Sequence, residues 1–97
     1  MTILFEITDK SRRKIHLSEK KWKHIRKKHP EVEELEQIKK TIQNPDKITS
    51  YGLDETIHYY YKFYKHRNQP LNYLLVIVKY LNNSGYIISS YFETHIK

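Results

Sequence analysis

The sequence predicts an α+β domain in which a short N-terminal hairpin and two helices precede an antiparallel sheet of about four strands. Three observations lead to this prediction. Apolar residues recur at helical spacing between residues 18 and 44, eight of the nine tyrosines stand after Tyr51, and a chain of 97 residues has room for one core. We therefore expect residues 1–97 to form a single domain, with the helices covering one face of the sheet.

The N-terminal third predicts a hairpin followed by a helix. Residues 3–7 and 15–17 are short alternating or β-branched segments, separated by a charged turn over residues 9–14. Ser18 is a favourable N-cap for a helix that continues to Lys28. Trp22, Ile25 and His29 fall on one stripe of this helix, and Trp22 should be largely buried between the helix and the sheet.

A second helix is expected to start at Pro30, because proline is well tolerated in a first turn and acidic residues favour a helix N-terminus. Four glutamates lie between residues 31 and 36. The expected apolar stripe contains Val32, Leu35, Ile38 and Ile42. Asn44-Pro45-Asp46 should end the helix.

The remainder of the chain predicts strands. A short strand is expected near residues 47–51, and three longer ones at 56–65, 71–81 and 86–94, with turns at 65–70 and 82–85. In the strand from Thr56, alternate residues share a face. We expect one set to line the core (Ile57, Tyr59, Tyr61, Phe63) and the other to present rings and a cation on the outer face (His58, Tyr60, Lys62, Tyr64, His66).

The charge pattern indicates a polyanion as partner. The net charge is +7, and the segment from Lys10 to Lys28 holds ten of the eighteen lysines and arginines against one acid, Glu19. Such a patch is typical of nucleic-acid binding, although an ordinary solvated lysine face would look the same. Composition alone leaves both interpretations open.

Several other classes of protein find no support in the sequence. Cysteine is absent, glycine occurs only at positions 52 and 85, and the acids do not form a Mg²⁺-type cluster, so we expect no metal and no cofactor. The N-terminus is not that of a signal peptide, and the longest apolar run is too short to span a membrane. We expect a cytoplasmic protein that does not interact with membranes.

Four stretches of the chain resemble a known family. These are WKHIRKKHPE from Trp22, IQNPDKI from Ile42, VIVK ending at Lys79, and GYIISSYF from Gly85. Together they are similar to the phage-associated nuclease domains of the barnase, EndoU, colicin and RelE group, over roughly residues 17–96. Family members typically carry threonine and alanine where Ser89 and Ser90 stand, and many carry arginine in place of Lys28.

The resemblance implies a metal-independent endoribonuclease, which attacks the phosphodiester through the ribose 2′-OH in a phage or toxin setting. An acidic antitoxin or immunity protein would then be a partner besides RNA. This chemistry needs proton-transfer groups and cationic support for the phosphoryl charge, and histidine titrates in the required range. Candidate catalytic residues are His24, His29, Tyr60, Lys62, Lys79 and Ser89. Candidate RNA-binding residues are Arg12, Arg13, Lys20, Lys27, Lys28, Tyr64 and Tyr91.

The two helix histidines cannot act alike. His24 and His29 are five residues apart, which places them about 140° apart around a helix. For each, a surface or structural role is as compatible with the sequence as a site role, and Lys79 could simply extend to solvent. Two other functions also stay open: a non-catalytic RNA-binding module, and a protein-interaction domain of a toxin system.

Overall fold

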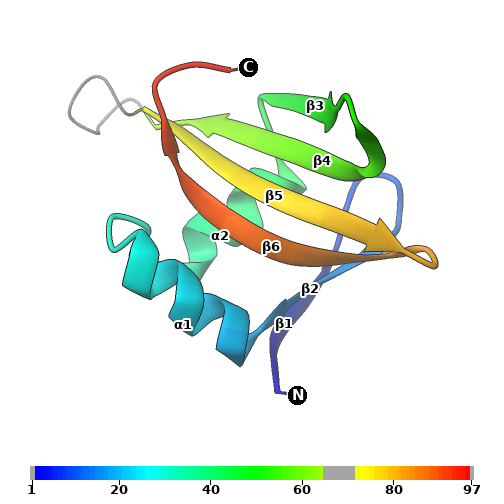
Figure 1. Cartoon of the computed structure of the whole chain (residues 1–97), viewed down its shortest axis with the longest axis horizontal. Helices are drawn as coiled ribbons and strands as arrows, with labels where there is room; N and C mark the ends of the chain where they lie inside the picture. The colour runs from blue at the N-terminus through cyan, green and yellow to red at the C-terminus, as the bar shows by residue number, and fades with distance from the viewer. Residues whose placement is uncertain (1, 65–71, 97) are drawn as a thin grey trace.

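The computed structural model describes residues 2–64 and 72–96. In these residues, the element order is β1 (Ile3–Thr8), β2 (Lys14–Ser18), α1 (Glu19–Lys28), α2 (Leu35–Gln43), β3 (Lys47–Tyr51), β4 (Asp54–Phe63), β5 (Tyr73–Leu81) and β6 (Ser84–Glu93). The strands form one sheet in the order β1-β2-β6-β5-β4-β3. Figure 1 shows α2 crossing behind this sheet and α1 lying beside β6.

The α+β class is confirmed, but the prediction of about four antiparallel strands is wrong. The N-terminal hairpin β1–β2 forms as expected, and it joins the same sheet as the later strands, which gives this sheet six strands in the described part of the chain. Residues 14–16 of β2 pair in parallel with residues 84–86 of β6, whereas all other neighbouring strands are antiparallel. Pairing between segments about 70 residues apart leaves no local pattern in the sequence, so the mixed sheet was missed.

A glycine permits this parallel junction. Gly85 is buried where β2, β6 and β5 meet. A Cβ atom at this position would lie 2.9 Å from side-chain carbons of Val78 and Tyr80, and 3.0 Å from Ile15. These distances are shorter than carbon–carbon contact, so only a residue without a side chain fits here.

Helix α1 forms as predicted. The Ser18 hydroxyl accepts a hydrogen bond from the Lys21 N–H at 3.1 Å, which confirms the predicted N-cap. Ile25 is buried, whereas Trp22 is only half-buried against the core. His29 is the C-cap residue of α1, and its N–H donates to the Ile25 carbonyl.

Helix α2 begins at Leu35, so the predicted start at Pro30 is wrong. Pro30 belongs to a loop that is bonded to Arg26 on the preceding helix. The Arg26 guanidinium donates hydrogen bonds to the carbonyl oxygens of Pro30 and Val32. Val32 lies in the same loop, and its side chain is buried in the core. The helix start is instead fixed by a capping box between Glu34 and Gln37, and Ile38 and Ile42 are buried as expected.

The two faces of the sheet were assigned the wrong way round on β4. Tyr60 pairs with Val76 and is 3% exposed in the main core, among residues contributed by the helices. Tyr61 points to the opposite face, where it is 0% exposed. Both faces of β4 carry aromatic side chains. The alternation of residues therefore did not show which face packs on the core. His66 and the predicted turn at 65–70 lie outside the described residues.

We call the face that packs on the helices the covered face, and its opposite the open face. On β5 the covered face carries Leu74, Val76, Val78 and Tyr80, and the open face carries Tyr73, Leu75, Ile77 and Lys79. The β5–β6 turn was predicted correctly: Asn82 and Asn83 have φ values of 52° and 68°, as in a type I′ turn. Asparagine tolerates this left-handed conformation better than most residues.

Candidate functional site

Four of the predicted site residues follow one another on the open face. Tyr91 and Ser89 alternate on β6, and Ser89 pairs with Ile77, two residues before Lys79 on the same face of β5. The ring of His29 lies 4.9 Å from the ring of Tyr91. We call His29, Tyr91, Ser89 and Lys79 the open-face row. Since a strand rises about 3.3 Å per residue, the levels of Tyr91 and Lys79 are about 13 Å apart.

The position of α1 explains how a helix residue reaches this face. Only residues 84–86 of β6 pair with β2, so along the rest of that edge β6 has no strand neighbour among the described residues. Helix α1 follows β2 directly and lies beside this part of β6 (Figure 1). Its C-terminal end therefore brings His29 against Tyr91 at the edge of the sheet.

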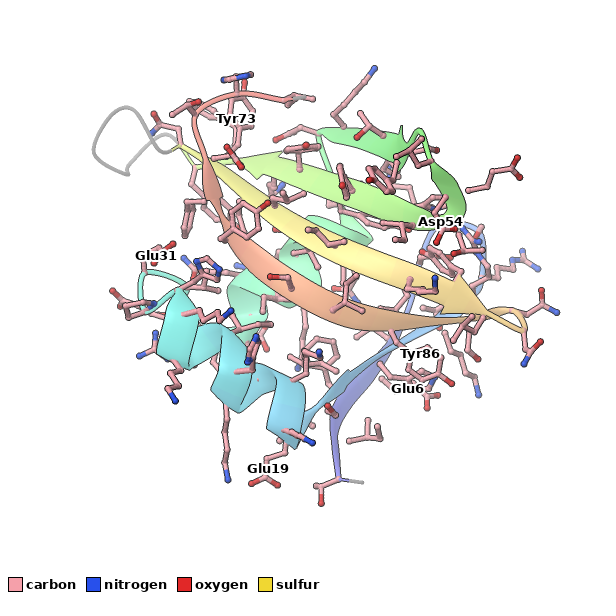
Figure 2. All side chains as sticks on the ribbon, in the orientation of Figure 1. Glu6, Glu19, Glu31, Asp54, Tyr73 and Tyr86 are labelled. Atoms are coloured by element: carbon pink, nitrogen blue, oxygen red, sulfur yellow. The ribbon has the colours of Figure 1, made fainter. Side chains whose placement is uncertain are left out.

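His29 also has a carboxylate beside it. Its Nδ1 atom lies 3.7 Å from a carboxylate oxygen of Glu31, within ion-pair range but too far for a direct hydrogen bond. The side chain is 31% exposed, and Figure 2 shows Glu31 in the loop at the end of α1. The bonds from Arg26 fix that loop. In many proton-transfer sites a carboxylate hydrogen-bonds to Nδ1 and leaves Nε2 facing the substrate. Glu31 lies near Nδ1 of His29 without making that bond.

Lys79, at the other end of the row, is held by Asp54. Its ammonium lies 3.0 Å from the Asp54 carboxylate, and both side chains are partly exposed. The hydroxyl and the N–H of Thr56 donate to the same carboxylate at 2.6 and 2.9 Å. The hydrogen bond from the Thr56 hydroxyl, followed by that from Lys79, lowers the pKa of Asp54 to about 2. Asp54 is therefore charged at neutral pH and pairs with the Lys79 ammonium at this end of the open face. Figure 2 labels Asp54 there.

Other predicted residues lie elsewhere. His24 is exposed on α1 beside a hollow that Thr2, Ser18 and Lys23 also line. Lys62 is on the covered face of β4, and its ammonium donates to the Asn44 carbonyl at 3.0 Å. The Tyr64 hydroxyl donates to the Gln37 carbonyl at 3.2 Å, and its ring packs against the core. The structure does not bring these three side chains to the open-face row.

Tyr60 belongs to a buried network that sequence reasoning missed. The Tyr80 hydroxyl donates to the Asp9 carboxylate at 2.8 Å, and the hydroxyls of Tyr60 and Tyr80 are hydrogen-bonded to each other. Burial raises the pKa of both tyrosines. We call Asp9, Arg13, Tyr60 and Tyr80 the Asp9 network. The acid stands alone in a basic turn, and this isolation was the one sequence feature that could have drawn attention to it.

Arg13 is part of this network rather than a free phosphate ligand. Its guanidinium lies over the Tyr80 ring at 3.6 Å and 3.4 Å from the Asp9 carboxylate. Burial alone would raise the pKa of Asp9, but hydrogen bonds from Ser11, Tyr80 and the Arg13 N–H outweigh it, so the pKa is lowered. The carboxylate is thus charged and attaches the β1–β2 turn to β5.

The basic segment is divided between two places. Arg12, with a φ of 69°, is exposed in the β1–β2 turn, whereas Lys20, Lys27 and Lys28 are exposed on α1. Figure 1 shows this turn and the C-terminal end of α1 at opposite ends of the molecule. The lysines on α1 are therefore the predicted phosphate ligands that lie on the same element as His29.

Neither a metal site nor a membrane-spanning helix is found in the described part of the chain. Among residues 2–64 and 72–96, no three histidine, aspartate or glutamate side chains are grouped so that they could hold a metal ion. In the same part of the chain, no helix has the length and apolar character needed to cross a membrane.

Comparisons with known proteins add nothing to this description. The sequence matches no family model and no curated protein, and the structure matches no solved structure.

Proposed function

We propose that the protein is a metal-independent endoribonuclease that cleaves RNA through the ribose 2′-OH. The observation that supports this most is the open-face row, in which an imidazole, two hydroxyl-bearing side chains and an ammonium follow one another on one face. This set supplies a proton acceptor, hydrogen-bond donors and a positive charge, as phosphodiester transesterification requires.

In the proposed step, Nε2 of His29 takes the proton of the 2′-OH, and the 2′ oxygen attacks the adjacent phosphorus. The bond from phosphorus to the 5′ oxygen breaks, which gives a 2′,3′-cyclic phosphate and a 5′-hydroxyl end. Lys79 donates the proton to the leaving oxygen, and Ser89 donates a hydrogen bond to the phosphoryl group. Proton transfer needs contacts of about 3 Å, so the Lys79 side chain must turn from Asp54 toward Ser89 when RNA binds.

The decisive experiment compares histidines in a cleavage assay. Purified protein is incubated with RNA in EDTA, and the products are analysed for cyclic phosphate ends. We expect His29→Ala to lower the cleavage rate on the order of 100-fold to 10,000-fold, the usual contribution of a general acid or base. His24→Ala tests the rival histidine, and we expect it to keep cleavage.

His95→Ala is the matched control, because this histidine is exposed near the C-terminal end of the described residues, with Thr94 as its neighbour. Equal loss in His24→Ala and His29→Ala would contradict the assignment of His29. Binding of RNA without any cleavage would instead support an RNA-binding module. The toxin setting and an acidic protein inhibitor stay predictions that depend on cleavage being found.

A further inference from the structure

A small pocket lies where β1, β2 and β6 meet the start of α1. Its volume is about 150 Å³, and it is lined by Ile3, His16, Ser18, Lys21, Tyr86, Ile87 and Ile88. Pockets for drug-sized ligands usually measure about 300–1,000 Å³, so this one suits a single ring system. The rings of His16 and Tyr86 are stacked within it, with centroids 5.2 Å apart and planes 27° apart.

The strand register connects this pocket to the open-face row. Tyr86 pairs with Lys79 on β5, and on its other side it pairs with His16 on β2. The stacked pair therefore continues the open face from Lys79 toward β1. Tyr86 is 38% exposed, so its ring can be covered by another flat group. Figure 2 labels Tyr86 and Glu6 close together in this part of the molecule.

The charges around the pocket favour an anion rather than a cation. Lys21 lines the pocket directly. The nearby carboxylate, Glu6, lies 3.4 Å from the Lys14 ammonium and 3.4 Å from Nδ1 of His16. Its charge is thereby balanced by Lys14, and it lies beside the His16 ring that stacks on Tyr86.

From this juxtaposition we infer that the pocket is a nucleotide subsite for single-stranded RNA. One unpaired base stacks on Tyr86, supported from behind by His16, and Lys21 neutralises the phosphate next to it. Stacking on aromatic side chains requires a base that is not in a duplex, so the substrate class is single-stranded. The identity of the ligand as RNA rests on the proposed function, whereas the subsite itself rests on the pocket and its stacked rings.

The test measures binding without cleavage. The probe is a fluorescent single-stranded 2′-O-methyl oligonucleotide, which lacks the attacking hydroxyl, in a series that carries one abasic nucleotide at each position in turn. We expect one position at which loss of the base weakens binding to the wild-type protein on the order of 10-fold, because stacking contributes about this much per base. In Tyr86→Ala the same abasic probe should bind as well as the intact probe, while Tyr86→Phe should retain the wild-type pattern.

Tyr51→Ala is the control, since Tyr51 has the same 38% exposure but lies on β3 at the other side of the sheet. It should leave the abasic pattern unchanged. An identical abasic pattern in wild type and Tyr86→Ala would overturn the subsite, as would equal binding of a duplex probe. Because the probe cannot be cleaved, the subsite can fail while His29-dependent cleavage stands. It can also stand in a protein that does not cleave RNA.

Discussion

The two faces of the central strands are built from alternate residues of the same segments, yet they differ in character. On the covered face, Val76 and Val78 pack against the helices, and the polar groups of the Asp9 network bond to one another. On the open face, Ser89 and Lys79 are partly exposed and point to a surface that the helices do not cover.

This difference suggests that stability and chemistry are separated by strand alternation. A substitution on the covered face should change the free energy of unfolding, and one at a polar, partly exposed residue of the open face should change activity or binding. Tyr61 and Leu75 lie on the open face but are buried, so they belong with the first group. Neighbouring residues in one strand can therefore serve as controls for each other. The predictions below test this separation.

The largest effect on stability is expected for Asp9→Ala. This change leaves the buried hydroxyls of Tyr60 and Tyr80 and the Arg13 guanidinium without their shared acceptor. Loss of a buried charged partner costs roughly 2–4 kcal/mol. Urea denaturation followed by tryptophan fluorescence measures it. Asp54→Ala, which removes the carboxylate on the open face, should cause a far smaller change, and equal destabilisation by both variants would contradict the distinction.

A smaller but sharper test compares Ser89 with Ser90. The Ser90 hydroxyl is buried and donates to the Leu75 carbonyl at 2.9 Å, so Ser90→Ala should cost about 1 kcal/mol of stability and leave cleavage unchanged. Ser89→Ala should keep stability and lower cleavage on the order of 100-fold, the lower end of what loss of one hydrogen-bond donor to a developing oxyanion costs. The comparison fails if the two variants show the same pattern in both measurements.

The smallest effect concerns the pH dependence of stability. Burial, followed by repulsion from Arg13, lowers the pKa of His58 from 6.5, although Asp9 partly opposes this. The folded state thus favours neutral His58, and the resulting stability is present above pH 6.5 and decreases as the pH falls below it. The urea concentration at the midpoint of unfolding should decline between pH 7.5 and pH 5.5. We expect this decline to be smaller in His58→Gln than in the wild-type protein. The exposed His95→Gln is the control, and a wild-type slope in His58→Gln would count against this role.

The local elements were largely predictable because their signals are local. Ser18 as a cap and the Asn82-Asn83 turn act within a few residues, and both formed as expected. Of the stripe predicted on α1, Ile25 is buried, whereas Trp22 is only half-buried. The start of α2 was misplaced because Arg26, on the preceding helix, stabilises the loop that contains Pro30. The parallel β2–β6 junction and the Asp9 network depend on residues far apart in the chain, which a single sequence does not pair.

The candidate site followed the same division. Residue types suited to the proposed chemistry could be chosen from the sequence. The face of the sheet on which each side chain lies could not be predicted. His29, Ser89, Lys79 and Tyr91 lie along one surface because of strand register and the place of α1. Tyr60, Lys62 and Tyr64 were placed on the wrong face because β4 is aromatic on both sides.

The parallel junction between β2 and β6 also bears on how the protein folds. Ile15 cannot find its partner Gly85 until about 70 further residues have been synthesised, and contacts of such long range form slowly. Ser89 and Tyr91 belong to the same late strand, whereas His29 comes early. A nascent chain that lacks β6 therefore has no assembled open-face row, and the proposed cleavage would require this late strand.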